Sequence, residues 1–174
     1  MPDRAFDLER SRAYWRHVPS GAGKQDTTAL RAADERTLCE TWDRAFAGRF
    51  RNYPEEEQLL RTLSERFRNR RVLSVGSGFG FHELYYAAHG ADVTCVDIVE
   101  SNVDVINRVA ALKGLTSIRA TWVADGDIGA FAAGFDVVFI YGSLMAMPAD
   151  RQRALLAAAR RRLSPGGSIV LMLY

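Results

Sequence analysis

Short apolar runs recur along the second part of the chain and alternate with segments of helical spacing. The runs that predict strands are residues 71–75, 92–97, 117–123, 135–140 and 168–174. Between them, apolar residues spaced three or four apart predict helices at about 80–89, 101–112 and 149–163. Strands that alternate with helices form a parallel sheet covered on both faces. We therefore predict an α/β fold for residues 71–174.

Residues 1–70 follow a different pattern, without strand-like alternation. The segment PEEEQLLRTLSERF, residues 54–67, opens with a proline and three acids and places four apolar side chains along one helical face. The polar, glycine-containing residues 19–28 predict a loop, as a plain connector or as a lid that a ligand orders. We expect residues 1–70 to form a helical cap, lying with residues 71–174 in one globular unit.

The start of one predicted helix carries a capping signal. Ser-Asn-Val-Asp at residues 101–104 has the spacing of a capping box, in which the first and last side chains bond to each other's backbone. This pattern predicts that the helix begins at Ser101.

Composition narrows the class of protein. A length of 174 residues with 48% hydrophobic and 25% charged residues fits one domain. Neither a membrane span nor a signal peptide is expected from the sequence, so we predict a cytoplasmic protein. Cys39 and Cys95 are expected to be reduced structural thiols. A net charge of +2 gives no case for nucleic acid, and the cluster Arg160–Arg162 falls at a predicted helix end, where it complements the dipole.

The turn after the first predicted strand contains three alternate glycines, Gly76, Gly78 and Gly80. In an open parallel sheet this turn lies at the edge where ligands bind. Glycine allows positive φ and lacks the Cβ that would keep a ligand away from the backbone, and a tight turn alone needs fewer glycines. A dinucleotide-binding turn would need a small residue at position 81, which is Phe81.

Acids follow the next two predicted strands, Asp97 after the second and Asp125 after the third. Singly, each acid is also typical of a loop or a helix cap. Together with the glycine turn, they place polar groups at the ends of three successive strands, which favours a cofactor site.

The spacing Gly-x-Gly-x-Gly resembles motif I of the class I S-adenosylmethionine-dependent methyltransferases. FDVVFIYGSLMAMP and LSPGG resemble the fourth-strand motif and the turn before the fifth strand of that family, so the resemblance covers about residues 71–174. More narrowly, YWRHVPSG and the terminal MLY resemble the UbiE-like, or type 11, group. The resemblance implies a Rossmann-like three-layer sandwich with parallel strand order 3-2-1-4-5, with S-adenosylmethionine as cofactor and S-adenosylhomocysteine as product.

The resemblance also implies a set of cofactor-binding residues. The glycine turn would line the methionine end, Asp97 would bind the ribose hydroxyls, Ile98 and Asp125 would contact the adenine, and Tyr141 would lie near the sulfonium. The whole set is Gly76, Ser77, Gly78, Gly80, Asp97, Ile98, Asp125, Gly126, Tyr141 and Gly142.

The sequence departs from the family at two motif positions. Ser74 stands where motif I has an acid that fixes the turn and helps to hold the methionine ammonium, and Met145 and Ala146 stand where many relatives have a histidine. A general base is therefore not assured, although positioning alone can accelerate transfer to a nucleophilic group.

The candidates for a base are His82, Glu83, His17 and Tyr141, of which we name His82 and Tyr141 as candidate catalytic residues. The candidate substrate pocket is Tyr14, Trp15, His17 and Met145. No spacing of Asp, His or Cys residues indicates a metal site.

The third departure is that the strands which usually follow the fifth are absent. The run SIVLMLY would then be a long apolar edge strand, so we expect a second subunit in a homodimer, or a missing C-terminal segment, to cover it. The expected reaction is methyl transfer to a small-molecule acceptor, with no nucleic acid or membrane partner. The alternatives are a non-catalytic cofactor-binding module or truncated partner subunit, and an enzyme that uses the same cofactor for cyclisation or elimination.

Overall fold

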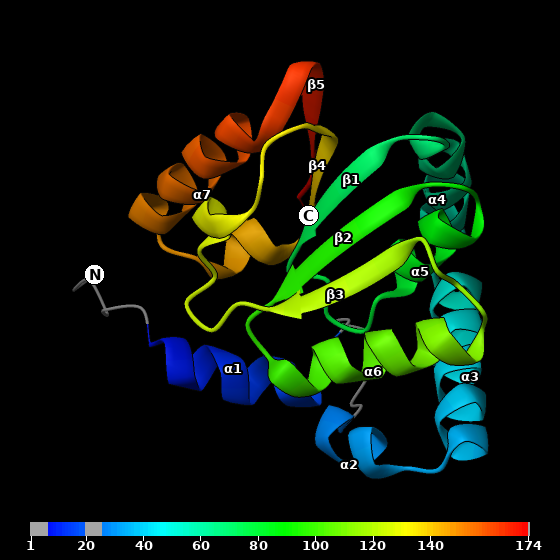
Figure 1. Ribbon diagram of the computed structural model, residues 1–174. Coiled ribbons are helices and arrows are strands. Elements are labelled where there is room, and N and C mark those ends of the chain that lie inside the picture. Colours follow the sequence, from blue (N-terminus) through cyan, green and yellow to red (C-terminus); the bar gives the residue numbers. More distant parts are fainter. Residues whose placement is uncertain (1–6, 20–25, 174) are drawn as a thin grey trace.

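Five parallel strands form one sheet in the order β3-β2-β1-β4-β5 (Figure 1). In the computed structural model, which describes residues 7–19 and 26–173, the strands are β1 (Arg71–Val75), β2 (Asp92–Asp97), β3 (Ile118–Trp122), β4 (Phe135–Tyr141) and β5 (Leu163–Met172). The strand order expected from the sequence is confirmed, because each crossover helix returns the chain to a parallel neighbour.

Helices cover both faces of the sheet. The crossover helices are α5 (Phe81–Ala88), α6 (Glu100–Leu112) and α7 (Ala149–Arg162). The helices of the N-terminal part are α1 (Leu8–His17), α2 (Thr27–Ala32), α3 (Glu35–Asn52) and α4 (Pro54–Phe67), and two short 3-10 helices are η1 (Ile128–Ala130) and η2 (Ser143–Ala146). In Figure 1, α7 lies on one side of the sheet, and α4, α5 and α6 lie on the other. The three-layer α/β sandwich is thus confirmed.

The helix predicted at residues 54–67 is α4, with the predicted ends. Pro54 occupies its first turn with three glutamates behind it, and its buried face contributes Leu60, Leu63 and Phe67 to the core between α4, α5 and the sheet. The rings of Phe67 and of Phe139 in β4 form a T-shaped pair, with 5.9 Å between the ring centroids. A strong amphipathic pattern with a clear start signal was therefore sufficient to locate this element.

The start of α6 differs from the prediction. The helix begins at Glu100 with Val99 as its N-cap, and no side chain caps it. Ser101 instead hydrogen bonds to the Thr27 hydroxyl in α2, with 2.8 Å between the oxygens, and Asn102 donates to Asp97. Asp104, the last residue of the predicted capping box, forms an ion pair of 2.9 Å with Arg31 in α2. The capping box is wrong because Ser101 and Asp104 both bond to residues outside the helix.

The segment LSPGG also differs from the prediction. It belongs to β5, whose register with β4 shifts between Phe135 and Val137, where Leu163 pairs with the first residue and Ser168 with the second. The four residues between these pairing positions are accommodated as an irregularity in the strand, with Gly166 at a positive φ of 80°. The glycines therefore lie in an irregular part of β5 rather than in a separate turn before it.

Helix α1 crosses the carboxyl ends of the strands (Figure 1). The Arg12 guanidinium donates to the Ala124 carbonyl after β3, and the Arg16 carbonyl accepts a hydrogen bond of 3.2 Å from Thr27. Helix α1 has no buried residue. Of the predicted loop 19–28, residues 20–25 lie outside the described residues, and α2 begins at Thr27. The division into a cap and a sheet domain stays a prediction.

Within the described residues, no helix combines the length and apolar character that crossing a membrane requires. Cys39 and Cys95 are both free thiols, and Cys95 is buried in β2. Arg160–Arg162 form the last turn of α7, as predicted. Strand β5 is an outer strand of the sheet, and its Leu171 side chain is 39% exposed.

Candidate functional site

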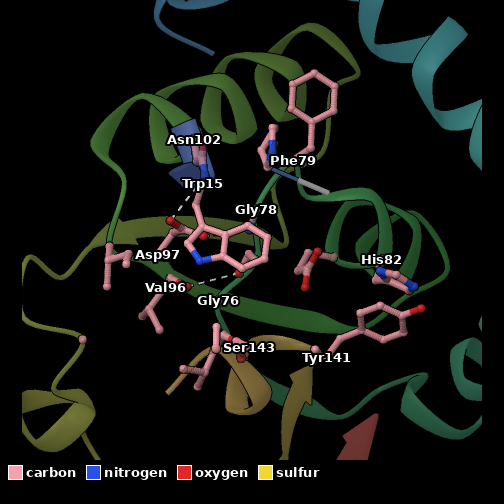
Figure 2. Close-up of a pocket in the computed structure, with 18 of the residues that line it drawn as sticks. Trp15, Gly76, Gly78, Phe79, His82, Val96, Asp97, Asn102, Tyr141 and Ser143 are labelled. Carbon is pink, nitrogen blue, oxygen red and sulfur yellow. Dashed lines mark hydrogen bonds between the residues drawn. The ribbon is translucent and has the colours of Figure 1, made fainter. Parts of the chain in front are cut away.

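A cavity of about 200 Å³ opens at the carboxyl ends of β1, β2 and β4. The turn after β1 forms one wall, the residues after β2 and β3 form a second, and the end of β4 with η2 forms the third. Trp15 and Ser11 of α1 cover it, and Figure 2 shows the Trp15 indole across the glycine turn. This is the edge at which the sequence predicted a cofactor.

The glycine turn is packed against protein on two sides. Gly76 and Gly78 have positive φ values of 77° and 54°. A Cβ on Gly76 would lie 2.5 Å from the Ser143 Cβ, and a Cβ on Gly78 would lie 1.7 Å from the Pro19 carbonyl oxygen. Both positions therefore require glycine because of their backbone conformation and because η2 and the N-terminal segment press on the turn.

Two further residues of the turn differ in their roles. Ser77 lines the cavity, and its backbone N–H donates to the Val96 carbonyl at 3.3 Å. Gly80 caps the N-terminus of α5 and does not line the cavity. A Cβ on Gly80 would lie 2.7 Å from the Cγ1 atom of Ile106, so α6 is what requires this glycine. The structure gives Gly80 a packing role, and its cofactor contact stays a prediction.

Asp97 lies at the end of β2 with its carboxylate 7% exposed in the cavity wall. Its Oδ2 accepts from the Gly78 N–H at 2.7 Å, and its Oδ1 accepts from the Val99 N–H at 2.8 Å and from Asn102 at 3.3 Å (Figure 2). Burial raises the pKa of Asp97 to about 6. A carboxylate has about four acceptor positions, so about one remains for a ligand hydroxyl.

The adenine side of the predicted site is only partly assembled. Ile98 and Gly126 both line the cavity, and a Cβ on Gly126 would lie 3.4 Å from the Cγ2 atom of Ile98. Asp125 does not line it, since its side chain is exposed and accepts from the Asp127 N–H at 3.0 Å. The adenine contact of Asp125 stays a prediction.

An aromatic and charged cluster forms the other end of the cavity. The rings of His82 and Tyr141 lie 4.3 Å apart between centroids (Figure 2). The Arg49 guanidinium donates to the Tyr141 hydroxyl at 3.2 Å and forms an ion pair with Glu56 at 2.8 Å. All but Glu56 line the cavity.

The two candidate catalytic residues are poorly suited to remove a proton. Burial, with a smaller contribution from the nearby Arg49 charge, lowers the pKa of His82 to about 3, so its imidazole is neutral at pH 7 but weakly basic. Burial raises the pKa of Tyr141, so its phenol stays protonated. The structure thus brings both residues to the cavity without giving either the properties of an effective base.

Glu83 is a base candidate whose surroundings the sequence did not predict. The buried Ser74 hydroxyl donates to the Oε1 atom of Glu83 at 2.6 Å, which joins the carboxyl end of β1 to the first turn of α5. Glu83 is 2% exposed and lines the cavity. Burial raises its pKa to about 7. The sequence signal that could have pointed to Glu83 was its position, nine residues after Ser74, where motif I has an acid.

Of the substrate-pocket candidates in the N-terminal segment, the structure brings one to the cavity. Trp15 lines it together with Ser11, four residues earlier on the same face of α1. Tyr14 and His17 are exposed and lie outside the wall, with Tyr14 packed edge to face on Trp15 at 4.9 Å. The helical spacing turns their side chains away from the cavity.

The fourth candidate, Met145, is also exposed and outside the wall. The positive φ of 68° at Gly142 starts η2, and this short helix directs Ala146 and Met147 to the cavity instead. Gly142 itself lines the cavity, as predicted. Among the described residues, no group of three or more His, Cys, Asp or Glu side chains could hold a metal ion.

Comparisons with known proteins agree with this geometry. The family model described as Methyltransferase domain matches residues 72–167. The biotin biosynthesis bifunctional protein BioHC of Cellvibrio japonicus is 31% identical over 110 residues, which are 63% of this chain. The chain spans 21% of the length of that protein.

Solved structures share the fold. The CcbJ methyltransferase from Streptomyces caelestis has a TM-score of 0.61 with 23% identity, covering 68% of this chain and 48% of that one. An S-adenosylmethionine-dependent methyltransferase from Thiobacillus denitrificans, in complex with S-adenosylhomocysteine, has a TM-score of 0.50 with 24% identity, covering 64% and 46%. The narrower UbiE-like assignment stays a prediction. The match over residues 72–167 and the strand order show that the chain belongs to the methyltransferase domain family, with the fold of the class I S-adenosylmethionine-dependent enzymes.

Proposed function

We propose that the protein binds S-adenosylmethionine in the cavity beside the glycine turn and transfers its methyl group to a small-molecule acceptor. The observation that carries this proposal is the buried Asp97 carboxylate, hydrogen bonded to the Gly78 N–H in the wall of the cavity. A buried acid with acceptor capacity remaining, beside a backbone that lacks side chains, fits a ribose next to an extended amino acid moiety.

The residues of the cavity fit the parts of this cofactor. Asp97 would accept from the ribose, while the apolar side chain of Ile98 and the bare Gly126 would border the adenine. The turn Gly76–Gly78 would lie along the methionine portion. When bound, the cofactor supplies an electrophilic methyl group on its sulfonium.

The acceptor end supports positioning rather than proton removal. A neutral His82 of low basicity and a protonated Tyr141 offer weak assistance in deprotonation. Transfer would therefore depend on holding a group that is already nucleophilic in line with the methyl group. Trp15 and Met147 would exclude water from the cavity that both line. Thiolates, carboxylates and unprotonated amines are acceptors of this kind.

Isothermal titration tests the cofactor assignment. We expect S-adenosylmethionine and S-adenosylhomocysteine to bind, and Asp97→Asn to weaken both by about 10- to 100-fold, because a charged acceptor is lost. Asp125→Asn tests the predicted adenine contact, and unchanged affinity would remove it. If Asp97→Asn binds as tightly as the wild type, the ribose assignment is wrong.

Product analysis tests the reaction. Incubation with S-adenosylmethionine carrying a labelled methyl group and a panel of thiols, carboxylic acids and amines should yield S-adenosylhomocysteine and a labelled acceptor in equal amounts. Binding without any turnover across the panel would favour the non-catalytic module. Consumption of S-adenosylmethionine without formation of S-adenosylhomocysteine would favour cyclisation or elimination.

A further inference from the structure

The fourth residue of β1 is not the acid that the family resemblance places at position 74. Ser74 is buried there, and its hydroxyl donates to the Glu83 Oε1 atom at 2.6 Å. The hydrogen bond links a strand residue to a helix residue nine positions later. A carboxylate is thus present at this end of the site, but α5 supplies it.

The second oxygen of this carboxylate has no partner in the part of the chain that the structure describes. The Oε2 atom of Glu83 is buried and accepts no hydrogen bond from any described residue, although the side chain lines the cavity. Buried polar atoms are nearly always hydrogen bonded, because leaving one without a donor costs free energy. An N–H group of a ligand in the cavity would satisfy it.

The charges around Glu83 favour a cationic ligand. Asp97 in β2 opposes ionisation of Glu83, Arg49 in α3 favours it, and Tyr86 and Cys95 also lie within electrostatic reach. Burial is the largest influence and keeps the pKa of Glu83 near 7. A positive charge placed against the Oε2 atom would favour the ionised form and would become buried with a counter-charge.

We propose that Glu83, positioned by the Ser74 hydroxyl, binds the ammonium group of the methionine portion of S-adenosylmethionine in place of the absent β1 acid. This inference rests on the proposed function. The competing explanation is structural: Glu83 would only fasten α5 to β1 through Ser74. The two explanations differ in what happens when the carboxylate becomes an amide, since Gln can still accept the Ser74 hydrogen bond.

The test compares two ligands in isothermal titrations of the full chain and its Glu83→Gln variant. S-adenosylhomocysteine carries the ammonium, whereas 5′-methylthioadenosine has the adenosine and the thioether but no amino acid. We expect Glu83→Gln to weaken S-adenosylhomocysteine binding by about 10- to 100-fold. Binding of 5′-methylthioadenosine should be unchanged, which shows that the site is still folded.

An exchange variant provides a rescue. S74E/E83S moves the carboxylate to β1 and the hydroxyl to α5 with the side-chain volumes conserved, and it should bind S-adenosylhomocysteine more tightly than Glu83→Gln. Proton release gives a second readout. With a pKa near 7, roughly half of the wild-type Glu83 is protonated at pH 7, so binding should release that proton into the buffer and Glu83→Gln should not.

The outcomes separate the two proposals. If Glu83→Gln binds S-adenosylhomocysteine as tightly as the wild type, or loses both ligands equally, Glu83 does not bind the ammonium and this inference is overturned. If the wild type binds neither ligand, the proposed function fails and this inference falls with it.

Discussion

Replacing Gly78 by alanine tests the contact between the glycine turn and the N-terminal segment. The new Cβ would lie 1.7 Å from the Pro19 carbonyl oxygen, and real contacts of this kind are essentially never below 3.0 Å. Either the turn or the segment must therefore move. Because α1 has no buried residue, we expect the N-terminal segment to lift away from the turn.

The expected loss of stability follows from the backbone conformation at position 78. Gly78 has a φ of 54°, where a residue with a Cβ costs about 1–2 kcal/mol. Gly114→Ala is the matched control, since Gly114 has a φ of 67° and a Cβ there would meet nothing within 4 Å. Both variants should lose about 1–2 kcal/mol in free energy of unfolding. Only Gly78→Ala should displace α1, because only its Cβ meets the N-terminal segment.

Denaturant unfolding, titration and fluorescence measure these effects. Gly78→Ala should bind S-adenosylhomocysteine at least about 10-fold more weakly, since the turn and Trp15 both line the cavity, and Gly114→Ala should bind normally. The tryptophan emission of Gly78→Ala should shift from that of the wild type, and the shift should vanish in a Trp15→Phe background. Equal binding and emission in the two glycine variants would refute the contact.

Three further predictions concern pH and assembly. The pKa of Glu83 in the folded protein, about 7, lies above its ordinary value of 4.5, so its contribution to stability is present below pH 4.5 and lost as the pH rises through 7. The unfolding free energy of Glu83→Gln should therefore rise by about 3 kcal/mol relative to that of the wild type between pH 4.5 and 8. A difference that stays constant over this range would contradict the prediction. The pKa of His82 is lowered to about 3, so its contribution is present above pH 6.5 and lost as the pH falls toward 3, and His82→Phe should flatten that acid-side loss in urea unfolding. If β5 pairs with a second copy, the wild-type chain should sediment as a dimer. The variant Leu171→Lys, which places a charge at a residue that is 39% exposed, should sediment as a monomer and keep the circular dichroism spectrum of the wild type. A monomeric wild type would exclude that pairing.

The periodic pattern of apolar residues was enough to predict the sheet and its crossover helices. Each predicted helix after residue 71 ends within one residue of the observed one, and α4 has the predicted bounds. This succeeds because periodicity reports which face of an element is buried, and burial is the dominant contribution to folding. Local signals did less well when a side chain had a distant partner. Ser101, for example, bonds to Thr27 rather than capping its own helix.

The candidate site likewise has residues that the sequence located and contacts that only the structure shows. The sequence located the glycine turn and Asp97, because parallel strands bring their carboxyl ends to one edge whatever their sequence separation. It could not predict that Asp125 is exposed, since the direction of a side chain in a turn depends on local backbone angles. Nor could it pair Ser74 with Glu83, because that hydrogen bond depends on how α5 packs on β1. Sequence fixes the order of the elements through local periodicity, whereas contacts between elements arise only when they pack.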